Sequence, residues 1–279
     1  MKNLSLKSVL GLALFYLAIL IVLGFLYFPI LWMVTTSFKY RMEAFKLPPE
    51  WLFKPTLENY IWVLTHSTVP RSYLNSIIVG FGSVALAMLI GVPAAYALAR
   101  FKMRRKEDLA FVILTARMGP PIGFIIPFFL MWRYIGMLDT PIALIITYLT
   151  FNIPLSVWMM RGFFESVPIA FEEAAMVDGC TRLQAFFKIV LPMVRTGMIA
   201  TSIICLIFSW TEFLFALTLT YVSSVTLPVA VTQFVAHQGI LWGQMMAAAI
   251  LISLPVIIFA IVVHRYIISG LTFGMIKGG

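Results

Sequence analysis

Residues 72–99 read SYLNSIIVGFGSVALAMLIGVPAAYALA, a stretch that contains no Asp, Glu, Lys or Arg. An α-helix needs about 20 consecutive apolar residues to cross a lipid bilayer. Apolar and polar positions do not alternate strictly here, and this pattern favours a helix over a strand of a membrane barrel. The stretch therefore predicts a membrane-spanning helix.

The composition of the whole chain also indicates a membrane protein. Of its 279 residues, 62% are hydrophobic and 11% are charged, which leaves too little polar surface to cover a soluble domain. This composition excludes a soluble enzyme. The formal net charge of +9 would suit nucleic-acid binding only if the basic residues gathered on one soluble face. They lie between apolar runs instead, so we expect no nucleic-acid partner.

Apolar runs like residues 72–99 predict six spans. The first run exceeds the ~15-residue apolar core of a signal peptide, so we expect it to be retained as a span. Together the runs predict an all-α integral membrane protein that is surrounded by membrane lipid. We expect it to form a single domain over residues 1–279. The expected spans are residues 9–34, 72–99, 109–136, 141–160, 196–219 and 244–269.

The distribution of Lys and Arg predicts the orientation, because cytoplasmic loops are enriched in these residues. They concentrate near both termini, at 100–106 and in the segment 161–195, whereas on the other side of the membrane they are confined to 35–71. We therefore expect both termini in the cytoplasm. Segment 161–195 is then a cytoplasmic loop, and segment 35–71 is an outer loop.

The cytoplasmic loop predicts a helix, a turn and a second helix. Pro168 suits the first position of a short helix, and Glu172 and Glu173 lie near its positive end. Gly179 supplies a left-handed stop, because glycine adopts positive φ without a steric penalty.

The second helix of this loop has a start signal and a stop signal of its own. Thr181 followed by Gln184 is the pattern of a capping box, and Pro192 redirects the chain at the other end. Phe186 and Phe187 are apolar residues on a loop in water. Exposed apolar side chains of this kind mark protein interaction sites, so we expect this loop to bind a partner.

The same loop carries a recognisable signature. Glu173-Ala174-Ala175, Gly179, Ile189 and Leu191-Pro192 stand at the spacing of the EAA motif. The chain therefore resembles the permease subunits of ATP-binding-cassette importers. Asp139-Thr140, Arg161-Gly162-Phe163-Phe164, Asp178-Gly179 and Lys277-Gly278 resemble the carbohydrate-importer branch of these permeases, the maltose-type inner permease in particular.

The resemblance implies a type I importer transmembrane domain in a prokaryotic inner membrane, which it crosses several times. It implies a heterodimer with a second permease, a cytoplasmic ATPase dimer that binds ATP and Mg, and an extracytoplasmic sugar-binding protein. The chain itself then has no catalytic residues and binds no cofactor. The implied ATPase-coupling residues are Glu172, Glu173, Ala174, Ala175, Asp178, Gly179, Ile189, Leu191 and Pro192.

Two charged residues inside the expected spans need a physical reason, because a charge at the bilayer centre costs at least ~2.5 kcal/mol on insertion scales. Arg117 precedes Gly119-Pro120-Pro121, which must break the helix and free backbone carbonyls. Either Arg117 lines a water-filled path, or it binds those carbonyls or a carboxylate of the second permease. Glu212 lies too near the outer side to match Arg117, and we expect it to form a structural ion pair with Arg133.

The fourth expected span carries a polar stripe. Tyr148, Asn152 and Ser156 recur every four residues and so share one helix face. These groups either contact a transported sugar near the middle of the bilayer or form hydrogen bonds between helices. Trp210 in the fifth span either stacks on a sugar ring or packs against other helices.

Three alternatives to a sugar importer remain open at this stage. A secondary transporter would show inverted repeats and acidic residues inside the membrane, and Glu212 is the only clear such acid. A membrane enzyme would show catalytic residues at suitable spacing. The same import machinery with a polyol or a glycerol-phosphate-type substrate is the third alternative. His66, His237 and His264 are scattered, so we expect no metal site.

Overall fold

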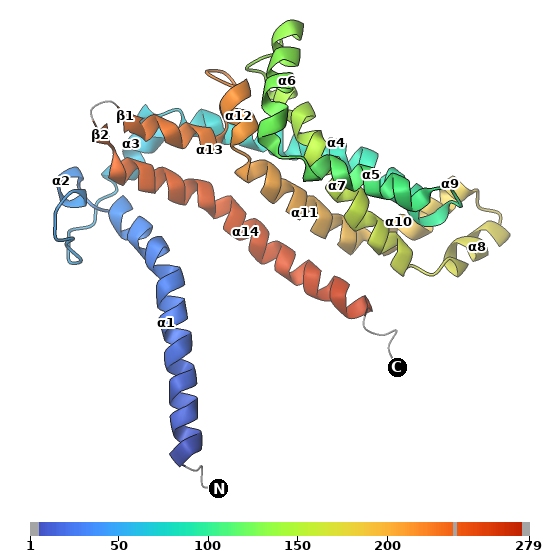
Figure 1. The fold of residues 1–279 in the computed structure, drawn as a ribbon, viewed down its shortest axis with the longest axis horizontal. Helices are drawn as coiled ribbons and strands as arrows, with labels where there is room; N and C mark the ends of the chain where they lie inside the picture. The colour runs from blue at the N-terminus through green and yellow to red at the C-terminus, as the bar shows by residue number, and fades with distance from the viewer. Residues whose placement is uncertain (1–5, 237–238, 275–279) are drawn as a thin grey trace. The chain divides into compact units, whose positions relative to one another are not determined.

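The computed structural model of the protein describes residues 6–236 and 239–274, and Figure 1 shows its helices. Nearly all of its regular structure is helical, which confirms the all-α prediction. His237 and Lys277-Gly278, which entered the sequence analysis, lie outside the described residues.

By its internal contacts the chain divides into two compact units, and each is described by itself. Unit 1 comprises residues 1–67 and 233–252, and unit 2 comprises residues 68–232 and 253–279. The single domain expected over 1–279 stays a prediction.

Unit 1 is built around the end of its first helix. Asn59 donates hydrogen bonds from Nδ2 to the carbonyl oxygens of Ser37 and Lys39, at 2.9 and 2.8 Å. The hydroxyl groups of Ser37 and Tyr60 are 2.8 Å apart, so α3 is tied to the end of α1. The elements are α1 (Leu6–Ser37), α2 (Arg41–Ala44), α3 (Glu58–His66), the antiparallel strands β1 (Val235–Ala236) and β2 (Gly239–Ile240), and the first part of α14 (Trp242–Gly274).

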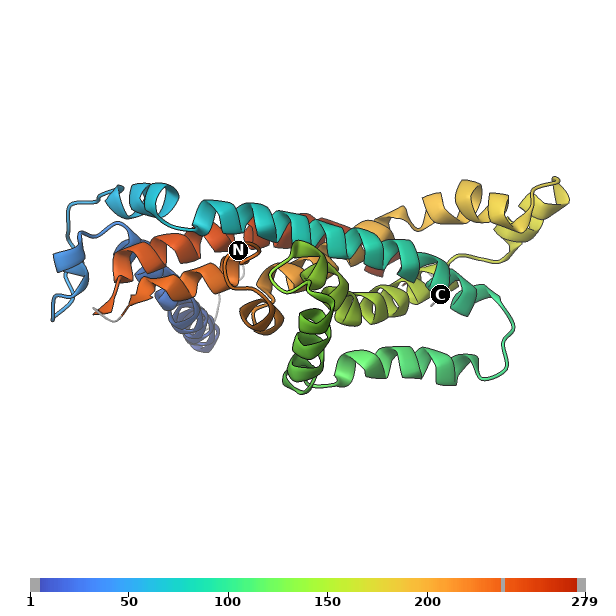
Figure 2. The same ribbon diagram turned by 90° about the horizontal axis from the view of Figure 1, so that it is seen from above.

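Unit 2 has a core of three helices that run side by side, α4 (Val69–Arg100), α7 (Pro141–Ser166) and α11 (Arg195–Thr211) (Figures 1 and 2). The most extensive packing is between α4 and α7. The other elements of unit 2 are α5 (Lys106–Met118), α6 (Pro121–Ile135), α8 (Ala170–Val177), α9 (Arg182–Ala185), the π-helix η1 (Phe186–Val190), α10 (Leu191–Met193), α12 (Leu214–Leu219), α13 (Leu227–Ala230) and the 3₁₀ helix η2 (Val231–Phe234).

The third expected span is broken where the sequence predicts. Helices α5 and α6 meet at an angle of 85°, and Gly119 and Pro120 between them are extended. The reason is that neither Pro120 nor Pro121 has a backbone N–H to continue the helical ladder.

The fifth expected span, 196–219, is not one helix. Helix α11 ends at Thr211 and α12 begins at Leu214. The carboxylate of Glu212 accepts the backbone N–H groups of Phe215 and Ala216, at 2.9 and 3.1 Å. A side chain that satisfies the N–H groups at a helix start stabilises a new helix at that point.

Four described helices, α1, α4, α7 and α14, contain a stretch long and apolar enough to cross a membrane. The number rises to six if the pair α5 and α6 and the pair formed by 182–193 and α11 each make one crossing. The second pair is bent by 73°. The predicted number of six spans and the placement of both termini in the cytoplasm stay predictions.

The helix, turn and helix predicted within segment 161–195 are confirmed. Helix α8 begins at Ala170 rather than at Pro168, and α7 extends to Ser166 into the expected loop. The capping box of Thr181 and Gln184 forms in both directions. The second helix continues through Pro192 to Met193, because proline is tolerated in the first turn of α10.

The turn before α7 is hydrogen-bonded to the segment 221–224 through the carboxylate of Asp139. Asp139 accepts hydrogen bonds from the backbone N–H groups of all four residues of the segment 221–224, at 2.7 to 3.2 Å. Burial of Asp139 disfavours its charged form, but these hydrogen bonds outweigh that effect and lower the pKa of the carboxyl below its ordinary value. The ionised carboxylate therefore stabilises the turn.

We predict that Gly91→Ala destabilises unit 2. A Cβ at this position of α4 would collide with the side chain of Ser156 on α7, and overpacking of this kind costs about 1–3 kcal/mol. Thermal unfolding of the purified protein in detergent measures the effect. Gly162→Ala in α7 is the control, because an added Cβ meets nothing within 4 Å there. Equal melting temperatures for the two variants would contradict close packing at Gly91.

We predict that Asp139→Asn lowers stability at pH 7 and that its effect shrinks in acid. The pKa of Asp139 is lower in the folded than in the unfolded state, so the stabilisation is present above the ordinary pKa of about 3.9 and is lost as the pH falls through the lower, folded value. Thermal unfolding at pH 7 and near pH 3 tests this. Asp108→Asn, at an exposed position of α5, should change little. A constant difference between wild type and Asp139→Asn at both pH values would contradict the prediction.

Candidate functional site

Residues 170–193, from α8 to α10, form a projection that we call the docking arm. It lies at one end of unit 2, beside the C-terminal end of α4 (Figure 2). The arm carries apolar side chains that the described chain leaves uncovered, with Val177 87% exposed and Leu183 and Phe187 also exposed. Apolar groups on such a surface indicate a protein partner.

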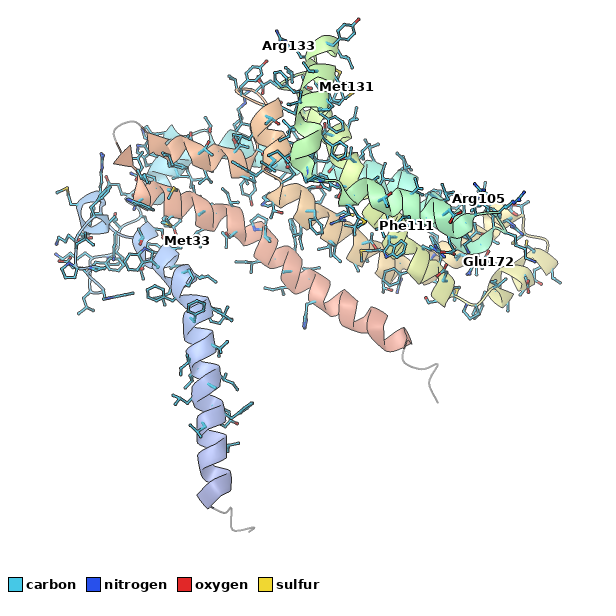
Figure 3. All side chains as sticks on the ribbon, viewed as in Figure 1. Met33, Arg105, Phe111, Met131, Arg133 and Glu172 are labelled. Atoms are coloured by element: carbon cyan, nitrogen blue, oxygen red, sulfur yellow. The ribbon has the colours of Figure 1, made fainter. Side chains whose placement is uncertain are left out.

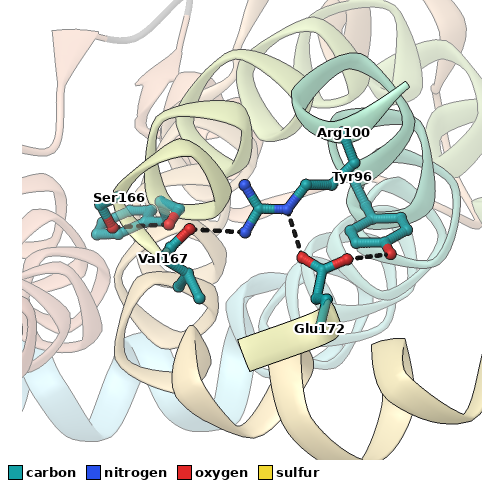
Figure 4. Close-up of polar contacts among 6 residues, drawn as sticks. Tyr96, Arg100, Ser166, Val167 and Glu172 are labelled. Carbon is teal, nitrogen blue, oxygen red and sulfur yellow. Dashed lines mark hydrogen bonds and ion pairs between the residues drawn. The ribbon is translucent and has the colours of Figure 1, made fainter. Parts of the chain in front are cut away.

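The arm is attached to unit 2 through Glu172. Arg100 at the end of α4 donates from Nε to Oε1 of Glu172, and the Tyr96 hydroxyl donates to Oε2 at 2.7 Å (Figure 4). Arg100 also donates from Nη2 to the carbonyl oxygen of Val167, at 2.8 Å. The side chains of Arg100 and Glu172 are only 5% and 7% exposed. This cluster is therefore a buried ion pair with additional hydrogen bonds at both ends.

Aromatic packing supports this attachment. Phe186 of the second arm helix is buried, and its ring centroid lies 4.6 Å from that of Tyr96 and 6.2 Å from that of Phe164. Phe187, the next residue, is exposed. The expectation that a partner covers both phenylalanines therefore needs a correction. Phe186 is covered by the chain itself, and Phe187 is free for a partner.

The EAA residues divide between two faces of the arm. Glu172 and Ala175 are buried, whereas Glu173 and Ala174 are exposed, since residues three apart share a helix face. The resemblance groups Glu172 with the residues that meet a partner. In the structure its carboxylate is occupied inside the chain.

The remaining coupling candidates lie at the turn and along the second arm helix. Asp178 and Gly179 are exposed in the turn, and Gly179 has the predicted positive φ of 90°. Pro192 is exposed, and Ile189 and Leu191 are half-buried. Most of the signature is thus available on the outside of the arm.

The polar stripe of α7 is fully buried. Asn152 donates to the hydroxyl of Ser209 on α11 at 2.8 Å, and Tyr148 donates to Glu212 at 3.0 Å. Ser156 lies 3.2 Å from the carbonyl oxygen of Ala87 on α4. In this conformation the stripe makes hydrogen bonds between helices.

Trp210 is buried as well. Its ring makes edge-on contacts with Tyr73 of α4 and Phe259 of α14, at centroid distances of 5.6 and 5.9 Å. These contacts are those of a packing residue of unit 2.

The expected ion pair between Arg133 and Glu212 is not formed. Arg133 is exposed near the end of α6 (Figure 3). Glu212 is bonded instead to Tyr148 and to the start of α12. A carboxylate at a helix start is stabilised by the backbone N–H groups, so it needs no basic side chain.

Arg117 lies between two cavities that share several lining residues. Their volumes are about 340 and 350 Å³. The guanidinium carbon lies over the ring of Phe208, 4.3 Å from its centroid, and the buried Nη1 has no hydrogen-bond partner. The first cavity is lined by Ala116, Arg117, Gly119, Pro121, Phe124, Phe128, Thr150, Phe151 and Phe215. The second is lined by Arg117, Pro121, Phe151, Phe208, Thr211, Glu212, Phe213, Leu214 and Phe215.

Sequence reasoning missed the anchor of the arm, formed by Tyr96 and Arg100. Arg100 was counted only as a loop charge, although it directly follows an apolar run. The two adjacent glutamates at 172 and 173 were a usable signal, because only one of them can share the buried face with Ala175. Nothing in the local sequence indicates Tyr96. Within the described ranges, no group of three or more His, Cys, Asp or Glu is placed to hold a metal ion.

Comparison with known proteins places these features in a family. Residues 60–272 match the family model described as "Binding-protein-dependent transport system inner membrane component". A probable ABC transporter permease of Sinorhizobium fredii is 41% identical over 92% of both chains. The trehalose transport system permease SugB of Mycobacterium tuberculosis is 34% identical over 92% of this chain and 95% of its own.

The fold also has a counterpart among solved structures. A chain of a bacterial ABC transporter "involved in the import of the acidic polysaccharide alginate" superposes with a TM-score of 0.78. It is 24% identical, and the match covers 95% of this chain and 99% of that one. The likeness shows that the two chains share a fold.

We predict that Glu172→Ala loosens the docking arm. The substitution leaves Arg100 buried without its counter-charge, and breaking a buried pair in this way costs about 3–5 kcal/mol. Hydrogen–deuterium exchange over 170–193 should become faster, while exchange in the central part of α7 should not. Glu173→Ala on the exposed face is the matched control. Equal exchange in both variants would mean that the ion pair does not hold the arm.

Proposed function

Because the chain belongs to the family of inner membrane components of binding-protein-dependent transport systems, we propose that it forms part of the translocation path of an ATP-driven sugar importer. It is a multi-pass permease subunit without catalytic residues of its own. The docking arm is its contact with the ATPase, and motion of the ATPase reaches unit 2 through that arm.

The observation that carries this proposal is the division of the arm into an exposed and a buried face. Glu173, Ala174 and Phe187 are exposed to a partner, whereas Glu172 is bound to Arg100 and Tyr96. A push on the exposed face is therefore transmitted to the end of α4 by a buried ion pair. Rigid-body movement of packed helices is a common means of switching between conformations.

The assembly in which this subunit works contains several further chains. We propose a second permease as the other half of a heterodimer, a cytoplasmic ATPase dimer that binds ATP and Mg, and an extracytoplasmic sugar-binding protein. This chain supplies no nucleotide-binding loop, because it has no Gly-x-x-x-x-Gly-Lys sequence.

Support for a sugar as the substrate comes from the relatives and from the cavities. One relative is named for trehalose transport, and the solved structure is described as importing a polysaccharide. Among the substrate-path candidates, Arg117 lines two cavities with aromatic walls, which suit a ligand with apolar ring faces. Tyr148, Asn152, Ser156 and Trp210 are buried in this conformation, so we propose that they support the path through the packing of α7 and α11.

We predict that Glu173→Lys weakens association with the ATPase by about tenfold or more, because one reversed charge at a protein interface commonly costs more than 1.4 kcal/mol. The test is a detergent pull-down on tagged wild-type and variant chains from the native cell, with the bound ATPase quantified. Glu58→Lys is the control, because it makes the same charge change at an exposed residue of the expected outer loop. Equal recovery of the ATPase with both variants would overturn the proposed role of the arm.

A further inference from the structure

Among the described residues, the positive charge of Arg117 has no counter-charge within ion-pair distance. We propose that the cavities at Arg117 bind the acidic group of a transported saccharide, a carboxylate, sulfonate or phosphate, while their aromatic walls hold a sugar ring. This inference rests on the proposed function and specifies the chemical class of its substrate.

The charge of Arg117 has no counter-charge in the described chain. No described acidic side chain lies within ion-pair distance of its guanidinium, and Nη1 is buried without a hydrogen-bond partner. A buried donor without an acceptor costs about 1–3 kcal/mol, and more when it is charged. An arriving anion removes this cost, so the site favours an acidic ligand over a neutral one.

The nearest acidic residue does not take this role. Glu212 lines the second cavity, but its two oxygens accept hydrogen bonds from Tyr148, Phe215 and Ala216. Its negative charge is therefore stabilised by donors of its own. The guanidinium is left free to bind a ligand.

The geometry of the guanidinium also suits an oxyanion. The guanidinium carbon of Arg117 lies over the ring of Phe208, 4.3 Å from its centroid, and this cation–π contact holds the group beside the cavities. The planar fork of arginine matches carboxylate and phosphate groups with two parallel hydrogen bonds. The contact with Phe208 thus holds the guanidinium at the cavities before the ligand arrives.

The walls of the cavities fit the rest of such a ligand. Phe124, Phe128, Phe151 and Phe215 contribute aromatic rings, and Thr150 adds a hydroxyl. Each cavity holds about 340–350 Å³, which lies within the usual range of about 300–1,000 Å³ for small-molecule sites. Apolar walls with a few polar groups are typical of sites that bury the faces of a ring and bind its substituents.

The bend between α5 and α6 is what makes room for this site. Arg117 ends the straight part of α5, and Gly119 and Pro121 at the bend line the first cavity. A continuous helix through these residues would have no break at this depth. The interruption predicted from the two prolines therefore has a use in ligand binding.

The test compares two ligands that differ in one group, methyl α-glucuronide and methyl α-glucoside. Binding of each is measured by calorimetry on the complete purified importer in nanodiscs, without nucleotide and with nucleotide trapped. We expect the wild type to bind the glucuronide at least about tenfold more tightly in one of these states. Arg117→Gln should reduce the ratio of the two affinities to about one.

Two further variants keep this test decisive. Arg133→Gln removes an exposed arginine of α6 and should leave the ratio unchanged. Arg117→Lys keeps the charge but not the planar fork, so it should assemble and lower the ratio by about threefold or more.

The proposal is overturned by equal affinities in the wild type, by absence of glucuronide binding in both states, or by an unchanged ratio in Arg117→Gln. Loss of the second permease from the Arg117→Gln complex, with no preference in the wild type, would assign Arg117 to a carboxylate of that subunit instead. These outcomes leave the association with the ATPase at Glu173 untouched. Failure of this inference is therefore distinguishable from failure of the proposed function.

Discussion

The buried ion pair between Arg100 and Glu172 is the contact on which the arrangement of the docking arm depends. An ion pair inside a protein loses the hydration of both charges, so it is retained in a good geometry only when hydrogen bonds satisfy both groups. Here the Tyr96 hydroxyl donates a hydrogen bond to the second carboxylate oxygen of Glu172. A second guanidinium nitrogen of Arg100 donates to the carbonyl oxygen of Val167. The pair thus joins α4, the end of α7 and α8 at one point. In the proposed coupling, this point is where movement of the arm reaches the packed helices of unit 2.

Two breaks in the helices of unit 2 place polar groups beside the cavities at Arg117. At Pro120 and Pro121 the backbone loses N–H donors, and the chain turns by 85°. At Glu212 the chain gains acceptors instead of losing donors, because the carboxylate accepts hydrogen bonds from the N–H groups at the start of a new helix. Both interruptions border the cavities around Arg117. Irregular backbone at membrane depth is tolerated where it is enclosed by protein or lines a cavity, and both cases fit that rule.

The polar stripe of α7 makes hydrogen bonds between helices in this structure, which is one of the two roles that its spacing left open. Asn152 and Ser156 hold α7 against α11 and α4 with side-chain hydrogen bonds, and the close approach at Gly91 permits this distance. Hydrogen bonds between helices are a main source of association where lipid provides no hydrophobic drive. The stripe thus joins the three central helices, while the aromatic walls and Arg117 form the cavities.

The features that could be predicted from the amino-acid sequence are those that depend on neighbours within a few residues. These are the long apolar helices, the break at Gly119-Pro120-Pro121, the capping box at Thr181, the positive φ of Gly179 and the EAA signature. Each follows from local backbone chemistry, such as a missing N–H or a missing Cβ.

Which distant side chains meet depends on how the helices pack, and local sequence patterns do not predict it. Arg100 and Glu172 are 72 residues apart, and Tyr148 and Glu212 are 64 apart. The structure pairs Glu172 with Arg100, and it pairs Glu212 with Tyr148 rather than with the expected Arg133. Local periodicity tells which face of a helix a residue occupies, but the packing of whole helices decides what lies opposite that face.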